Sequence, residues 1–391
     1  MNNLVPLERL TAPAELDGSD SSLRHRHSTV LIANNDLEAV EYWLAQYEDN
    51  PHTHRSFKKE VERLMLWALF ERRKALSLLN GEDLKAYRDF LLSPPHEWCY
   101  TSGRAPRRDS PDWRPLAGPL KNSSVMTAMN TIRALYTFLL ENGYISISPF
   151  AQKGLSRIIK KDARRQFKKE KDNVQSRALQ DNSLDRLIDE ALAMPTGSIK
   201  QNFKRERALF ILQFGIFLAP RLSEMANAQM SDFRVLSSDK WWWRVVGKGD
   251  KEEDVPVRNE MLEALSNWRN AISSYSLNSQ LSPLPSKDER GPVLRRIDGR
   301  TAISSSSIYA VIKELAEHAC SRLDAHTKEY QQLSSMSPHW LRHTAITQLA
   351  NAKTRERYLQ AFARHSKRET TEIYITDNAE SFHNSINGIE N

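Results

Sequence analysis

The chain has 391 residues, 40% of them hydrophobic, which is enough for two or three domains with their own cores and excludes a disordered chain. Its net charge of +7 favours a polyanionic partner, although such a charge also serves simple solubility. No stretch approaches the roughly 20 apolar residues of a membrane span, and no signal pattern opens the chain. The two cysteines, Cys99 and Cys320, fit neither a metal site nor a disulfide framework. We therefore expect a protein of the reducing cytoplasm without membrane association.

The first part of the chain is polar and then becomes helical. Residues 1–34 contain prolines and a Ser/Asp cluster, which predicts a loose N-terminal arm. Apolar residues then recur at spacings of three and four over 57–68 and over 125–139, and a further helix is predicted over 82–92. We therefore predict a small helical domain over 35–150.

A segment rich in proline and glycine, 93–122, interrupts this helical pattern. It is either an ordinary basic surface loop or an insertion that contacts nucleic acid. Its arginines are Arg104, Arg107, Arg108 and Arg114.

The most basic part of the chain is a predicted linker over 151–175. A run of like charge is commonly a solvated face, but a linker between two domains is also where a clamp closes around a polyanion. We expect this run to contact a phosphate backbone. The candidate contacts are Lys160, Lys161, Arg164, Arg165, Lys168 and Lys169.

The second domain is predicted over 176–391. Ser183 is a candidate N-cap for its first helix, and the aromatic and β-branched segment 241–246 favours a strand that turns at 247–250 and returns. The fold class we predict is mainly α with a small antiparallel β-sheet in this domain. Helices are expected over 184–192, 205–217 and 305–320 and on towards the end of the chain.

Chemically suited side chains gather in the C-terminal part of the chain. Two guanidiniums, one ammonium and two imidazoles would surround a phosphate, and one phenol would attack it, without a metal or other cofactor. Two of them share the segment Ser-Pro-His-Trp-Leu-Arg-His-Thr, and the last histidine lies nine residues before the tyrosine. The six are Arg221, Lys248, His339, Arg342, His365 and Tyr374.

In these motifs the chain resembles the tyrosine recombinases of the phage integrase family. The motifs span about 220 to 375, and the order of helical domain, basic linker and catalytic domain extends the resemblance to about 35 to 385. The resemblance implies a two-domain, C-shaped clamp around duplex DNA. The chain departs from the family at two places: Ala219 stands where the family usually has Gly, and Ala363-Arg364 stand where it usually has Leu-Gly.

The resemblance implies roles for the cationic residues. Arg221 and Arg342 would bind the non-bridging phosphate oxygens with planar guanidinium groups, and Glu224 would support Arg221. Lys248, in the predicted hairpin turn, would be the general acid that protonates the leaving 5′-oxygen. Lys251 is a nearby competitor for that role.

The histidines and the tyrosine complete the implied site. His339 would accept the tyrosine proton or hold the phosphate, whereas His343 has no comparable assigned role and is expected to pack structurally. A zinc site at His339 and His343 is the weaker alternative, because a third ligand is not evident. His365 would donate a hydrogen bond to the phosphate. Tyr374 would be the nucleophile, although a single tyrosine near a helix end is commonly a packing residue.

The resemblance therefore implies a site-specific DNA recombinase that cuts and rejoins strands through a 3′-phosphotyrosine, as a homotetramer on two duplexes, with accessory DNA-bending or directionality proteins as further partners. The alternatives are a type IB topoisomerase-like relaxing enzyme and a non-catalytic DNA-binding protein. The tail after Tyr374 predicts a short helix with Phe382, Ile386 and Ile389 on one stripe. That stripe either packs on its own domain or docks on a neighbouring subunit.

Overall fold

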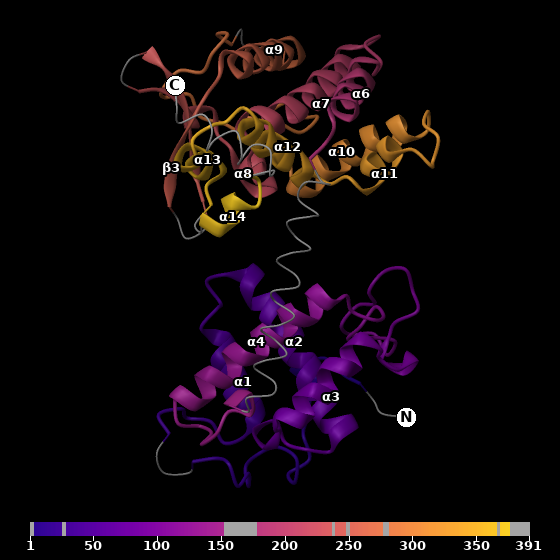
Figure 1. The fold of residues 1–391 in the computed structure, drawn as a ribbon, viewed down its shortest axis with the longest axis vertical. Coiled ribbons are helices and arrows are strands. Elements are labelled where there is room, and N and C mark those ends of the chain that lie inside the picture. Colours follow the sequence, from indigo (N-terminus) through magenta and orange to yellow (C-terminus); the bar gives the residue numbers. More distant parts are fainter. Residues whose placement is uncertain are drawn as a thin grey trace, which may run out of the picture. The chain divides into compact units, whose positions relative to one another are not determined.

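The computed structural model describes residues 4–25, 29–151, 178–236, 239–247, 251–276, 281–365 and 368–375. The chain divides into two compact units, residues 1–168 and 169–391, each with its own hydrophobic core. Helices dominate both units (Figure 1). Of the helices in the described ranges, none is long and apolar enough to cross a membrane. The predicted basic linker lies beyond Ala151, outside the described residues.

In its described residues, the first unit has four α-helices. Helix α2 packs against α1 and α4, and α3 packs against α4. Asn80 caps α3 by accepting hydrogen bonds from Glu82 and Asp83, and the Asp83 carboxylate accepts from the Asn80 amide in return. The described elements of this unit are η1 (Leu7–Arg9), α1 (Asp36–Ala45), α2 (Pro51–Trp67), η2 (Ala68–Arg72), η3 (Leu76–Leu78), α3 (Gly81–Leu92), η4 (His96–Trp98), α4 (Asn122–Glu141) and η5 (Pro149–Ala151).

The N-terminal segment is not the loose arm that we predicted, at least over its described residues. Leu4, Leu7 and Leu10 are buried in the core of the first unit. The amide of Leu7 also donates to the buried Glu62 carboxylate at 2.7 Å. Apolar side chains repeated every three residues give this short segment a face to bury, and that outweighs its prolines.

The segment 93–122 packs into the same core. Trp98, Trp113 and Leu116 are buried. Arg108 makes ion pairs with Glu8 and with the buried Glu62. The charge of this arginine is therefore used inside the unit, which favours the ordinary structural interpretation of Arg108 over nucleic-acid contact.

The second unit joins a helical core to one small sheet. Its three antiparallel strands lie in the order β1-β2-β3, with Trp243 of β2 opposite Phe233 and Val255. The predicted fold class and the predicted strand over 241–246 are thus confirmed. The described elements are α6 (Asp181–Leu192), α7 (Ile199–Leu218), α8 (Leu222–Asn227), η6 (Met230–Asp232), β1 (Phe233–Val235), β2 (Trp241–Val246), β3 (Glu252–Pro256), α9 (Asn259–Ser276), α10 (Ser305–Cys320), α11 (Lys328–Ser335), α12 (Pro338–Asn351), α13 (Glu356–Ala363) and α14 (Arg368–Glu372).

The prediction of Ser183 as an N-cap is wrong. Helix α6 begins three residues earlier than predicted, at Asp181, with Gln180 in the cap position. Ser183 is buried in the first turn and its hydroxyl donates to Gln332 of α11 at 3.1 Å. The Ser183 hydroxyl therefore bonds to a side chain of another helix and not to the backbone at the start of α6, as we had predicted.

Helices α7 and α12 approach each other closely, and this contact positions the candidate site. A Cβ atom added to Gly215 of α7 would lie 2.7 Å from Cδ1 of Leu341 on α12. Glycine inside a helix is unfavourable by roughly 0.5–1 kcal/mol relative to alanine, but here it allows the Leu341 side chain to pack directly on the backbone of α7. The end of α7, which leads to Arg221, is thereby held against Arg342.

Candidate active site

Five of the six predicted catalytic residues lie in the described parts of the second unit. Arg221 is the N-cap residue of α8, and His339 and Arg342 lie in α12. His365 follows α13, and Tyr374 follows α14. The sixth residue, Lys248, lies outside the described residues, as do the linker cations Lys160 to Lys169 and the tail after Ile375.

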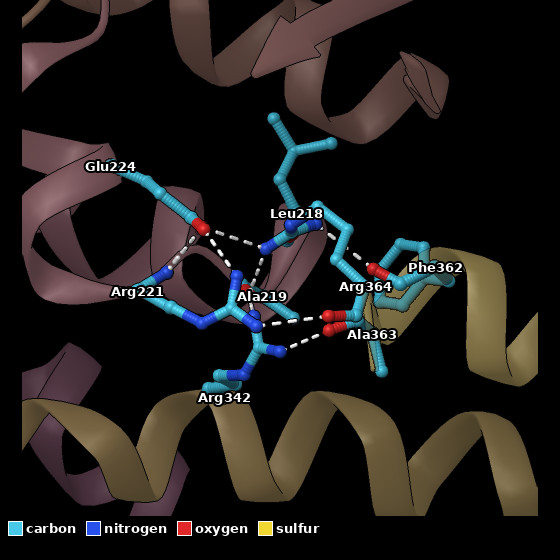
Figure 2. A network of polar contacts seen from close by, with 8 residues as sticks. All are labelled: Leu218, Ala219, Arg221, Glu224, Arg342, Phe362, Ala363 and Arg364. Atoms are coloured by element: carbon cyan, nitrogen blue, oxygen red, sulfur yellow. Dashed lines mark hydrogen bonds and ion pairs between the residues drawn. The ribbon is translucent and has the colours of Figure 1, made fainter. Parts of the chain in front are cut away.

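Arg221 is anchored by Glu224 at the start of α8 (Figure 2). The Arg221 amide donates to Glu224 Oε2 at 2.7 Å, and its Nη1 donates to Oε1 at 2.5 Å. Its Nη2 donates to the carbonyl of Arg364 at 2.9 Å. The side chain remains 37% exposed, so part of the guanidinium is available to a ligand. Glu224 therefore makes the contact with Arg221 that the resemblance implied.

Arg342 is held by carbonyl oxygens on two separate segments. Its Nη1 donates to Ala219 and its Nη2 donates to Ala363. These carbonyls lie at the ends of α7 and α13, so one guanidinium joins three helices (Figure 2). Because Arg342 is only 2% exposed, its orientation is fixed before any substrate arrives.

Arg364 is a third arginine of this cluster, and our sequence analysis gave it no role. Its Nη2 donates to the Ala219 carbonyl at 2.7 Å and to Glu224 Oε2 at 3.0 Å, and its Nη1 donates to the carbonyl of Phe362 at 2.9 Å. The guanidinium also lies 5.6 Å from the Trp243 ring centroid. Its signal in the sequence was the departure from the family's usual glycine.

Both departures from the family pattern adopt the backbone conformation that favours glycine. The φ angle is 47° at Ala219 and 51° at Arg364. A residue with a Cβ is less stable there by roughly 1–2 kcal/mol, and such strain persists where the surroundings determine the conformation. The hydrogen bond from the Arg364 side chain to the Ala219 carbonyl links the two strained positions directly.

The cluster carries three guanidiniums beside the carboxylate of Glu224. Burial, together with the charges of Arg364 and Arg221, lowers the pKa of Arg342 from 12.5 to about 9. An arginine nevertheless stays protonated in proteins, so this shift reflects a charge that is buried first of all and also crowded by two other positive charges. An anion bound here would relieve it, which makes the cluster a candidate phosphate site.

His365 is neutral at pH 7 in this environment. Burial first, and then the charges of Arg342, Arg221 and Arg364, lower its pKa from 6.5 to about 4. Its Nδ1 lies 3.0 Å from the hydroxyl of Thr371, which is fully buried. When that hydroxyl donates to Nδ1, the ring proton is on Nε2, where it can be donated to a phosphate oxygen.

Tyr374 lies between two imidazole rings. Its ring stacks on His365 and on His343, with centroids 5.8 and 5.6 Å away. Its hydroxyl lies 2.5 Å from Nδ1 of His343, and Tyr374 and His343 are both buried. His343 in turn contacts the ring of His339 edge-on at 4.3 Å. His343 is thus packed, as we expected, but it also contacts the one atom expected to react.

Sequence comparisons agree with this geometry. A family model described as the phage integrase family matches residues 177–381, which is more than half of the chain. The tyrosine recombinase XerC of Vibrio vulnificus strain YJ016 is 26% identical over 339 residues, covering 85% of this chain and 84% of that protein. The XerC of Vibrio parahaemolyticus is 28% identical over 67% of this chain and 71% of its own length.

Solved structures show the same fold. The XerH site-specific recombinase bound to difH substrate aligns over 99% of both chains, with a TM-score of 0.57 and 14% identity. The Tn1549 transposon integrase in complex with transposon right end DNA aligns over 90% of this chain and 99% of its own, with a TM-score of 0.55 and 12% identity. The family resemblance predicted from the motifs is confirmed: the chain belongs to the phage integrase family of tyrosine recombinases.

Proposed function

We propose that this protein is a site-specific DNA recombinase that cleaves and rejoins strands through a 3′-phosphotyrosine at Tyr374. One observation carries the proposal. In a member of this family, the guanidiniums of Arg221 and Arg342 are bonded to the carbonyls of Arg364 and Ala363, next to His365, whose ring contacts that of a buried tyrosine. This combination supplies both a site for the scissile phosphate and a nucleophile for it.

Each step of the reaction has a side chain suited to it. Arg221 and Arg342 bind the non-bridging oxygens and stabilise the charge of the pentacoordinate transition state, and His365 donates a further hydrogen bond. The Tyr374 oxygen forms a bond to phosphorus while the bond to the 5′-oxygen breaks. Lys248 protonates that leaving oxygen. Attack by a 5′-hydroxyl reverses these steps, so rejoining needs no ATP.

The same proposal covers the larger assembly. The helical domain over 35–150 and the catalytic domain over 176–391 close as a C-shaped clamp on duplex DNA, with the basic linker on the phosphate backbone. Four copies assemble on two duplexes in the cytoplasm, on the bacterial nucleoid, and the tail over 378–391 docks on a neighbouring subunit. Accessory DNA-bending or directionality proteins are the further partners.

A nicked suicide duplex tests the proposal. DNA flanking the protein's gene is footprinted to find a bound site, and that site is rebuilt with a nick beside the cut, so that the released fragment diffuses away. A recombinase accumulates a covalent protein–DNA adduct in excess EDTA, whereas a non-catalytic binder only shifts the DNA in a gel. A strict magnesium requirement for cleavage contradicts the mechanism.

Two further assays separate recombination from topoisomerase-like relaxation. A recombinase joins strands between two duplexes that carry the site, and its activity depends on that sequence. A relaxing enzyme removes supercoils from a plasmid without the site and gives no joined product. That second outcome would show that the protein is a type IB topoisomerase-like relaxing enzyme instead of a recombinase.

A further inference from the structure

The hydroxyl of Tyr374, its reacting atom in the proposed function, contacts the imidazole of His343. The phenolic oxygen lies 2.5 Å from Nδ1 of His343, which is a short hydrogen-bond distance. Tyr374 is 5% exposed and His343 is 4% exposed. Bulk water is therefore kept from the hydroxyl, and an imidazole occupies the place where a proton must leave.

His343 is also held rigidly relative to the phosphate site. It follows Arg342 directly in α12, and Arg342 is fixed by the carbonyls of Ala219 and Ala363. The residue that binds the phosphate and the residue that contacts the nucleophile are thus neighbours on one helix. Such a helix places the hydroxyl and the phosphorus in a defined relation, which is where positioned acid–base groups are effective.

Because a phenol ionises only near pH 10 in water, attack at neutral pH needs a proton acceptor. On the basis of the proposed function, we infer that His343 is a catalytic residue, the general base that takes the proton of Tyr374 during attack. In our sequence analysis that role fell to His339. His339 is exposed and lies against the edge of the His343 ring, where it is placed to meet the arriving phosphate.

The proton balance closes over one reaction cycle. The neutral His343 ring, with its proton on Nε2, accepts the phenolic proton at Nδ1 as the Tyr374 oxygen bonds to phosphorus. The electron pair of the broken P–O bond stays on the 5′-oxygen, which takes a proton from the general acid assigned to Lys248. In rejoining, the 5′-hydroxyl returns that proton, and the released Tyr374 oxygen recovers its own from His343.

A fluorinated tyrosine tests this role specifically. In His343→Asn, the Oδ1 atom keeps an acceptor near the position of Nδ1 but has almost no basicity. Single-turnover adduct formation on the nicked duplex is expected to slow by about 10²- to 10⁴-fold. Replacing Tyr374 by 3,5-difluorotyrosine, a more acidic phenol, is expected to restore at least tenfold of that loss. The same replacement in the otherwise native enzyme gives the reference ratio, and the ratio of fluorinated to unfluorinated rate is expected to be at least tenfold higher in the His343→Asn background.

His339→Asn is the matched control, because it alters the neighbouring ring and leaves the contact between His343 and Tyr374. Fluorination is expected not to rescue it. Thermal unfolding and duplex affinity establish that each variant is folded, and His343→Gln is used if the Asn variant does not fold.

Three results overturn the inference. If His343→Asn cleaves within threefold of the native rate, or faster, the contact with His343 only holds Tyr374 in the DNA-free protein and does not contribute to catalysis. If fluorination changes the rates of the native and variant enzymes equally, His343 does not accept the proton of Tyr374 in the rate-limiting step. Selective rescue of His339→Asn returns the role to His339. If the native enzyme itself forms no adduct, the proposed function fails instead.

Discussion

The arginine cluster and the tyrosine segment are held in different ways. Arg342 and Arg364 are buried and bonded to carbonyls at the ends of α7 and α13, and Glu224 joins Arg364 to Arg221. Tyr374, by contrast, follows the five-residue helix α14. The exposed Arg368 of that helix pairs with Glu356 of α13 at 2.7 Å.

The two regions are proposed to serve different steps: the arginine cluster binds the phosphate, and the tyrosine segment reacts with it. The guanidiniums proposed to bind the phosphate are fixed before DNA arrives, so little reorganisation is needed when charge develops on the phosphate. The proposed nucleophile follows a short helix, and its position depends on the burial of Ile373 and Tyr374 and on the hydrogen bond between Tyr374 and His343. Substitutions in the two regions are therefore expected to differ in kind as well as in size.

The largest expected effect is the loss of the phenolic oxygen. Tyr374→Phe is expected to abolish covalent adducts, because only the nucleophile is removed, and to leave duplex affinity within about twofold. Loss of the bond to His343 is expected to change the free energy of unfolding by about 1 kcal/mol. Denaturing gels with the nicked duplex measure the adduct, and adducts from the Phe variant would assign the nucleophile to another residue.

In the arginine cluster the first test keeps the charge and removes the planar fork. Arg221→Lys and Arg342→Lys are each expected to slow single-turnover cleavage by roughly 10²- to 10³-fold. Arg342→Lys is expected also to lower stability, because the Ala363 carbonyl loses the donor that Arg342 supplies, at about 1–3 kcal/mol for an unsatisfied group, whereas the Ala219 carbonyl keeps its hydrogen bond from Arg364. Arg221 is partly exposed, so its variant separates the catalytic effect from the structural one. Native cleavage rates from either variant would remove that arginine from the site.

The carboxylate of Glu224 is expected to matter mainly for stability. Burial alone raises its pKa, but the charges and hydrogen bonds of Arg364 and Arg221 outweigh burial and lower the pKa below 4.5. The stabilisation is therefore complete above about pH 4.5 and is lost as the pH falls through the lowered pKa. Glu224→Gln is expected to lower the free energy of unfolding by roughly 3–5 kcal/mol at pH 7, because it breaks a buried pair.

Urea unfolding at pH 7 and pH 4 measures this difference, which is expected to narrow at the lower pH. Glu252→Gln is the control in the same unit, since Glu252 is 62% exposed and lies 3.8 Å from Arg244. Such an exposed pair is expected to contribute less than about 1 kcal/mol. A difference at Glu224 that is constant with pH would show that its charge does not stabilise the cluster.

The sequence predicted the parts of the site that chemistry and local structure dictate. The motif spacing singled out Arg221, Arg342, His365 and Tyr374, and the structure brings these four residues together. A phosphate-transfer site needs these side chains whatever the surrounding packing, so their pattern can be recognised without a structure.

The pairings inside the site could not be predicted in the same way. His343 and Tyr374 are 31 residues apart, and Arg364 reaches back 140 residues to Glu224. These contacts depend on how α7, α12 and α13 pack, which is not encoded in any local periodicity. The left-handed backbone of Arg364 had a single signal, the glycine that the family usually has at this position, because an arginine rarely adopts that conformation.

The smallest expected effect concerns that left-handed backbone. Arg364→Ala and Arg364→Gly both remove the bonds to Glu224 and Ala219, so both variants are expected to be less stable than the native protein. Only glycine is at ease at the observed φ of 51°, so Arg364→Gly is expected to be more stable than Arg364→Ala by about 1 kcal/mol. Urea midpoints measure the difference.

Lys353 gives the matched comparison, because it is exposed and also has a positive φ, 56°. The same Gly-over-Ala difference at Lys353, with no loss relative to the native protein in Lys353→Gly, would separate the backbone strain from the network that the Arg364 side chain makes. Equal stability of the two Arg364 variants would mean that the backbone leaves the left-handed conformation once the side chain is gone, so that the side chain itself imposes the strain.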